Sequence, residues 1–106
     1  MSRRFCARAF LKPEKREEYI ALHRAVPKEV LETIDRCNLR NYSIHISGNE
    51  VVSYFEYIGD DYDADMAKME KDEATIEWWK HTKPCFEKHD EGVYYEDMSE
   101  IFYHNK

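Results

Sequence analysis

The chain contains 106 residues, of which 42% are hydrophobic and 14% aromatic, and its formal net charge is −6. This length and this share of apolar residues fit a single core, so we expect residues 1–106 to fold as one domain. The negative charge and the lack of a Lys/Arg cluster argue against a nucleic-acid partner, because binding a phosphate backbone requires a positive surface.

The first part of the sequence predicts a strand and two helices. Residues 4–11 carry apolar side chains at every second position, which is typical of a half-buried strand. Pro13 and the acidic residue after it suit the first turn of a helix, which we expect to reach about Leu22. A second helical pattern follows Pro27 and continues to about Asn38. We therefore expect a helix that is split or kinked near the second proline.

The middle of the sequence predicts a β-hairpin followed by two more helices. Residues 41–46 and 51–58 are rich in β-branched and aromatic side chains, and residues 47–49 between them have the composition of a tight turn. Residues 63–71 and 73–86 then show helical spacing of their apolar side chains.

The end of the sequence completes the pattern of elements. Residues 87–94 indicate a polar loop, and residues 95–103 a final strand. The order strand, helix, strand, strand, helix, strand predicts an α+β fold of the ferredoxin-like type, with an antiparallel sheet covered by helices on one face. The other face needs a cover, so we expect a symmetric homodimer in which each sheet closes off the other's pocket.

The N-terminus and the cysteines indicate the compartment. The sequence begins without the apolar run of a signal peptide and contains no stretch long enough to cross a bilayer, so we expect a cytoplasmic protein with no membrane partner. Cys6, Cys37 and Cys85 are odd in number and lack C-x-x-C spacing. They are interpreted as reduced, structural thiols.

Tyr19 and His23 are the first candidates for chemistry. They are four residues apart on the first predicted helix, so both side chains lie on one face about one turn apart and can reach one ligand. Imidazole titrates near neutral pH, which makes His23 the best candidate for proton transfer. The alternative is a surface histidine that only hydrogen-bonds to a neighbour.

Aromatic residues supply the other candidates. Trp78 and Trp79 are adjacent on a predicted helix, where side chains point about 100° apart, so one of them is expected to line a pocket. Indole rings stack on the apolar faces of pyranose rings, and their N–H groups donate to hydroxyls. The alternative places one tryptophan in the core and one at a dimer contact. Tyr42 either presents its phenol to a cavity or packs in the core.

A metal site has weak support in the sequence. The remaining histidines lack H-x-x-x-H or H-x-E spacing; they are His45, His81, His89 and His104. Gly-rich phosphate loops, G-x-S-x-G elbows and dinucleotide-binding fingerprints are also missing. We therefore expect neither a metal nor an organic cofactor.

Read together, these motifs resemble the L-rhamnose mutarotase family. The similarity extends over nearly the full chain and rests on the joint order and spacing of several short motifs. These motifs are Arg3-Arg4-Phe5, Glu17-Glu18-Tyr19 with His23, Asn41-Tyr42-Ser43-Ile44, Trp78-Trp79-Lys80 and Ser99-Glu100-Ile101-Phe102-Tyr103. Two segments depart from the family pattern. Residues 25–29 lack the tryptophan of a usual Trp-Pro-Glu run, and residues 87–92 replace an Asn-Pro-Asp-like loop.

The resemblance implies a dimeric α/β barrel with a pocket for one pyranose in each chain. It implies that His23 is the proton donor, and that Tyr19, Tyr42, Trp78 and Trp79 contact the sugar. The expected function is interconversion of the anomers of a deoxyhexose, with L-rhamnose as the expected sugar, by acid/base ring opening. A cofactor-independent monooxygenase of the same architecture and a non-catalytic sugar-binding module are the alternatives, because fold does not fix function.

Overall fold

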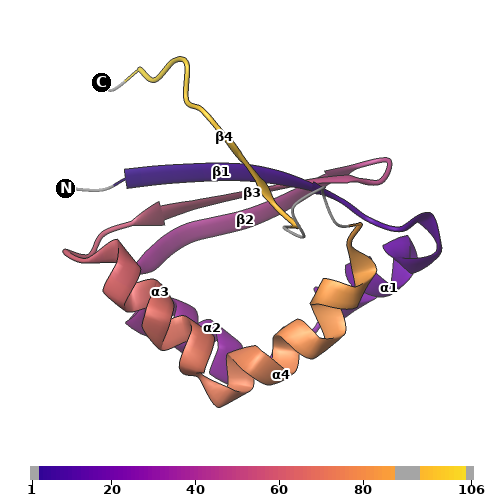
Figure 1. Cartoon of the computed structure of the whole chain (residues 1–106), viewed down its shortest axis with the longest axis horizontal. Helices are drawn as coiled ribbons and strands as arrows, with labels where there is room; N and C mark the ends of the chain where they lie inside the picture. Colours follow the sequence, from indigo (N-terminus) through magenta and orange to yellow (C-terminus); the bar gives the residue numbers. More distant parts are fainter. Residues whose placement is uncertain (1–2, 88–93, 105–106) are drawn as a thin grey trace.

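A four-stranded antiparallel sheet organises the computed structural model, which describes residues 3–87 and 94–104. The strands are β1 (Arg3–Phe10), β2 (Leu39–Ser47), β3 (Glu50–Tyr57) and β4 (Glu96–Met98), in the order β2-β3-β1-β4. The helices are α1 (Arg16–Leu22), α2 (Lys28–Arg36), α3 (Tyr62–Lys71) and α4 (Glu73–Thr82), with short 3-10 turns η1 (Pro13–Lys15) and η2 (Lys83–Cys85). Figure 1 shows the four helices on one side of the sheet. The predicted ferredoxin-like fold is confirmed.

The central strands form because their apolar side chains alternate. β1 pairs with β3 along its whole length, from Arg3 opposite Tyr57 to Phe10 opposite Glu50. β2 and β3 form the predicted hairpin, and its turn requires Gly48, whose φ of 59° is a left-handed conformation that glycine adopts without steric cost. The buried core lies between this sheet and the helices. Its buried members include Ala9, Leu11, Tyr19, Val51, Cys85 and Phe86.

β2 contains an irregularity that the sequence did not reveal. Its register against β3 shifts between Arg40 and Ser43, and Asn41 in between has a φ of 51°. Leu39 and Tyr42 are three positions apart, so regular alternation would place them on opposite faces of the sheet. The bulge instead allows Leu39 to be buried while Tyr42 lines the pocket described below.

Two predicted boundaries are wrong. The helix expected over residues 73–86 ends at Thr82 and continues as the 3-10 turn η2, because Pro84 has no N–H group for an α-helical bond. The strand expected over residues 95–103 is limited to β4, which pairs with β1 only from Cys6 opposite Met98 to Arg8 opposite Glu96. The chain then leaves the sheet and leads away on the side opposite the helices (Figure 1).

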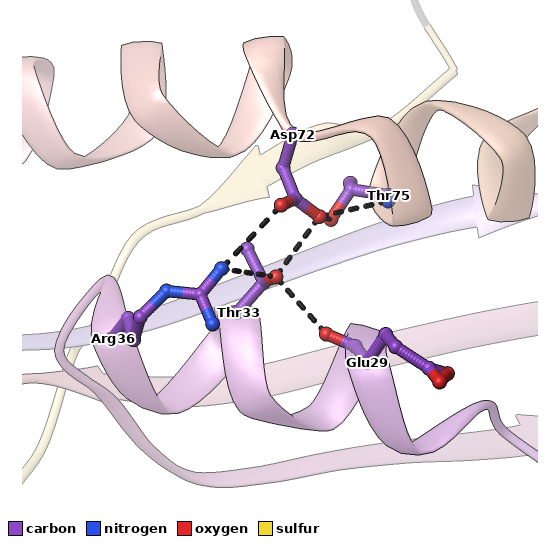
Figure 2. A network of polar contacts seen from close by, with 5 residues as sticks. All are labelled: Glu29, Thr33, Arg36, Asp72 and Thr75. Carbon is purple, nitrogen blue, oxygen red and sulfur yellow. Dashed lines mark hydrogen bonds and ion pairs between the residues drawn. The ribbon is translucent and has the colours of Figure 1, made fainter.

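A polar network joins α2 to α4 (Figure 2). The Asp72 carboxylate caps α4 by accepting hydrogen bonds from the backbone N–H and the hydroxyl of Thr75, at 3.0 and 2.9 Å. The same carboxylate lies 2.9 Å from the Thr33 hydroxyl of α2 and 3.4 Å from a guanidinium nitrogen of Arg36. The capping bonds, above all those from Thr75, hold the pKa of Asp72 below its usual value. One side chain therefore sets the spacing between two helices.

Asp72→Ala should lower the melting temperature by roughly 4 to 8 °C, the shift expected for a lost helix cap in a domain of this size. Because the pKa of Asp72 is lower in the folded chain, its stabilisation is present at neutral pH and is lost as pH falls. The difference between wild type and Asp72→Ala should therefore narrow below about pH 4. Calorimetry at several pH values measures both effects. Glu70→Ala on the exposed surface of α3 is the control, and an equal loss in both variants would contradict the capping role.

Candidate active site

One pocket of about 530 Å³ lies between the helices and the sheet. Its walls come from α1, α2, β2, α4, η2 and the chain just before β4. The lining residues are Tyr19, His23, Val26, Val30, Leu31, Ile34, Tyr42, Ser43, Ile44, Trp78, Trp79, Thr82, Lys83, Phe86, Tyr94 and Tyr95. A cavity of this size and largely aromatic and aliphatic lining is typical of a small-molecule site.

The structure brings together all the site residues predicted from the sequence. Tyr19 lies on α1, His23 caps the C-terminal end of that helix, Tyr42 lies on β2, and Trp78 and Trp79 lie on α4. Both tryptophans line the pocket and both are only half-buried, so neither takes the alternative place in the core. Elements distant in the sequence therefore converge on one cavity.

His23 is held in one orientation. Its Nδ1 lies 2.9 Å from the backbone carbonyl oxygen of Tyr19, one helical turn earlier. A carbonyl oxygen only accepts hydrogen bonds, so Nδ1 donates and Nε2 is the nitrogen left for a ligand. The imidazole also packs against the Tyr19 ring at 4.4 Å and meets the Trp78 ring edge-on at 5.2 Å between centroids.

Three tyrosine hydroxyls belong to the same pocket. The Tyr19 and Tyr95 oxygens are 3.5 Å apart, and Tyr42 lies near enough to both that a negative charge on one phenol would disfavour ionisation of the others. Burial raises the pKa of Tyr19 and of Tyr42 well above the ordinary phenol value, and the neighbouring Tyr95 adds to both shifts. Burial also raises the pKa of Tyr95. These phenols therefore keep their protons at neutral pH and act as hydrogen-bonding groups.

The remaining walls differ in chemistry. Aliphatic side chains from α2 and the residues before it form one wall: Val26, Val30, Leu31 and Ile34. Lys83 lies at the exposed edge of the pocket, with its ammonium nitrogen 4.3 Å from the centre of the Trp79 ring. No aspartate or glutamate is found among the described lining residues. Phenol, hydroxyl and imidazole groups thus supply most of the polar contacts that a ligand can make.

Sequence reasoning missed several lining residues. The sequence pattern predicts Tyr94 at the end of a loop and Tyr95 at the start of a strand, whereas both line the pocket; a second pair of adjacent aromatic residues is the signal that indicates this. Val26 lines the pocket within the segment that lacks the family tryptophan, so this wall is aliphatic. The other departure from the family pattern, at residues 87–92, lies outside the described residues except for Glu87.

The pocket is lined by residues of α1, α2, β2 and α4 within one chain. The expected homodimer, in which each sheet closes off the other's pocket, stays a prediction. Within residues 3–87 and 94–104, no group of three or more His, Cys, Asp and Glu side chains is arranged to hold a metal ion. In the same residues, every helix is too short or too polar to cross a membrane. The cysteines are free thiols.

Known structures share the fold at low sequence identity. An L-rhamnose mutarotase from Formosa agariphila superposes with a TM-score of 0.77 at 17% identity, covering 97% of this chain and 99% of that chain. A conserved protein from Methanosarcina mazei has a TM-score of 0.64 at 16% identity, covering 92% and 89%. A protein from Nitrosomonas europaea described as an antibiotic biosynthesis monooxygenase has a TM-score of 0.63 at 14% identity, covering 92% and 86%. These similarities concern the fold.

Sequence comparison identifies the family. No curated protein matches the chain. The family model for L-rhamnose mutarotase, however, matches residues 4–104. This range contains all four strands apart from Arg3, the first residue of β1, and it contains every lining residue of the pocket. The chain therefore belongs to the L-rhamnose mutarotase family.

Proposed function

We propose that this protein is a sugar mutarotase that interconverts the α and β anomers of a deoxyhexose pyranose by acid/base ring opening. One observation carries the proposal: the His23 imidazole is oriented by the Tyr19 carbonyl within an aromatic pocket, which leaves Nε2 for a ligand. Membership of the L-rhamnose mutarotase family supports the reaction class. The protein from Nitrosomonas europaea that is described as a monooxygenase shares only the fold, and fold does not fix chemistry.

The walls of the pocket favour a deoxy sugar such as L-rhamnose. Trp78 and Trp79 offer indole rings against the apolar face of a pyranose, and Tyr19 and Tyr42 offer hydroxyls to its polar edge. The aliphatic wall of α2 suits the methyl group that a 6-deoxyhexose carries in place of a hydroxymethyl group. A hexose with a hydroxymethyl group on this wall would lose hydrogen bonds to water without replacing them.

The proposed reaction needs one proton donated and one removed. Protonated His23 gives a proton from Nε2 to the ring oxygen, while the anomeric hydroxyl loses its proton to a bound water and the ring C–O bond breaks. The aldehyde then rotates about its bond to the next carbon and the ring closes on the other face by the reverse transfers. Tyr19 does not act as a phenolate base, because its raised pKa keeps it neutral at neutral pH. Its role is to bind the sugar.

His23→Asn should lower the enzymatic rate of anomer exchange by about 10²- to 10⁴-fold, the usual contribution of one acid/base group, while sugar binding is retained. Saturation-transfer proton NMR of the anomeric resonances of L-rhamnose, L-fucose and D-glucose measures the exchange rate, and ligand-observed NMR measures binding. His81→Asn is the control, because His81 is exposed on α4 and lies outside the pocket lining.

Other outcomes of this experiment separate the alternatives. Full activity of His23→Asn would reject the proposed mechanism. Saturable binding of a monosaccharide by the wild type with no change in exchange rate would indicate a sugar-binding module. Oxygen uptake with aromatic substrates, and no effect on any sugar, would indicate a monooxygenase.

The tautomer of His23 is a second expected outcome. When neutral, the ring should carry its proton on Nδ1, because the Tyr19 carbonyl accepts from that nitrogen and leaves the lone pair on Nε2. Long-range ¹H–¹⁵N correlation spectra at a pH where the ring is neutral distinguish the two tautomers. His104, which lies in the exposed tail and outside the described pocket lining, is the internal comparison. A proton on Nε2 would show that the orientation described here is not the one in solution.

We also propose that the protein is a homodimer built on the open face of the sheet. The residues after β4 are anchored by a double hydrogen bond from Arg4 to Glu100, at 2.7 Å each, and by the Arg4 guanidinium over the Tyr103 ring. Ile101 and Phe102 next to this anchor are 97% and 80% exposed. Such apolar side chains on an anchored segment are suited to contact a second copy.

Phe102→Asp should shift the protein from dimer to monomer, because a carboxylate in an apolar contact would be buried without a partner. Sedimentation velocity over a range of protein concentrations measures the change. Ala67→Asp adds the same charge on the exposed surface of α3, on the helix side of the sheet, leaves the tail intact, and serves as control. A wild-type protein that sediments as a monomer at high concentration would contradict the dimer proposal.

A further inference from the structure

Tyr95 lies at the site but has no part in the reaction described so far. It precedes β4, far along the chain from Tyr19, yet the two hydroxyl oxygens are 3.5 Å apart inside the pocket. The Tyr95 ring packs edge-on against Phe86, at 5.3 Å between centroids, and Phe86 belongs to the buried core. The same Phe86 ring also packs edge-on against Tyr19, at 5.1 Å. One core residue therefore supports both phenols.

The distance between the two oxygens leaves them open to a ligand. Strong O–H···O hydrogen bonds have oxygen separations near 2.7 to 2.8 Å, so a separation of 3.5 Å is a weak contact. A third oxygen placed beside the pair can lie within hydrogen-bonding distance of both. Each phenol can donate or accept, and both stay protonated because burial raises the pKa of Tyr19 and Tyr95. A hydroxyl, which both donates and accepts, is the matching ligand group.

The other lining residues of the pocket indicate that this pair of phenols binds a hydroxyl of the sugar. The described lining of the pocket contains no carboxylate to accept hydrogen bonds from sugar hydroxyls, so neutral hydroxyl groups take that place. Tyr19 connects the pair to the proposed reaction centre, because its ring contacts His23 while its hydroxyl meets Tyr95. A sugar hydroxyl bound by the pair is therefore held on the Tyr19 side of the pocket.

We propose that Tyr19 and Tyr95 form a clamp for one secondary hydroxyl of the pyranose, and that Tyr95 is a specificity-determining residue. This inference rests on the proposed sugar site and names the class of ligand further: a monosaccharide with a free hydroxyl at the clamp, with the analogue lacking that hydroxyl rejected. Rejection follows because an apolar carbon at this position leaves the two phenols with only their weak mutual contact of 3.5 Å.

The test combines a protein change with a ligand change. L-rhamnose and its 2-deoxy, 3-deoxy and 4-deoxy derivatives are compared in wild type and Tyr95→Phe, by anomer exchange for kcat/KM and by ligand-observed NMR for Kd. Tyr95→Phe should weaken L-rhamnose binding by about 3- to 10-fold, the value of one neutral hydrogen bond, with kcat changed less than KM. The wild type should discriminate against one derivative, and Tyr95→Phe should reduce that discrimination by about threefold or more.

Tyr54→Phe is the matched control. It also removes a phenol hydrogen bond, from Tyr54 to Glu56 at 2.7 Å, but lies outside the pocket lining. It should leave discrimination among the derivatives unchanged. Equal discrimination by wild type and Tyr95→Phe against all three derivatives would overturn the clamp. The exchange and binding readouts are independent: if the wild type binds L-rhamnose without accelerating exchange, the proposed function fails, and the comparison of Kd values still decides whether the clamp exists.

Discussion

The burial of Tyr19 is the constraint on which the site depends. Its side chain is only 4% exposed and packs against the core residue Phe86. Because this ring fixes the end of α1, the Tyr19 backbone carbonyl is in place to accept from Nδ1 of His23, and the hydroxyl reaches the pocket beside Tyr95. Tyr19 therefore links the core to the His23 imidazole and to the Tyr95 hydroxyl. The orientation of the imidazole is a consequence of core packing, which makes it rigid before a ligand arrives.

The two other sides of the pocket depend on polar constraints. α2 and α4 face each other across the cavity, and their spacing is set by Asp72, which caps α4 and contacts Thr33 of α2. On the sheet side, the bulge at Asn41 brings Tyr42 into the pocket. Buried hydrogen bonds fix geometry more sharply than apolar packing alone, since each has a preferred distance and angle. The hydrogen bonds of Asp72 and the bulge at Asn41 therefore fix the position of the pocket walls, although the walls themselves are largely apolar.

Local sequence patterns predicted the elements, and the missed features depend on distant partners. The alternation of residues 4–11 and the turn at Gly48 are signals within a few residues, so β1 and the hairpin were predictable. The length of β4 depends on how far β1 can pair with it, and the β2 bulge depends on register against β3. Neither leaves a local pattern. The contact of Tyr95 with Tyr19 was missed for the same reason, because the two residues are distant in the sequence, although the adjacent pair Tyr94-Tyr95 was itself a local signal for the pocket.

The departures from the family pattern change the walls of the pocket and spare its centre. His23, Tyr19 and the two tryptophans carry the sequence resemblance to the family, and all of them line the cavity. Val26 lies in the segment where the resemblance leads us to expect a tryptophan, and it contributes an aliphatic side chain to the pocket wall. Selectivity must then come from hydrogen bonding, because an apolar pocket discriminates weakly between sugars whereas unpaired buried hydroxyls discriminate strongly. In this chain the phenols of Tyr19, Tyr42 and Tyr95 are among the groups able to supply these hydrogen bonds.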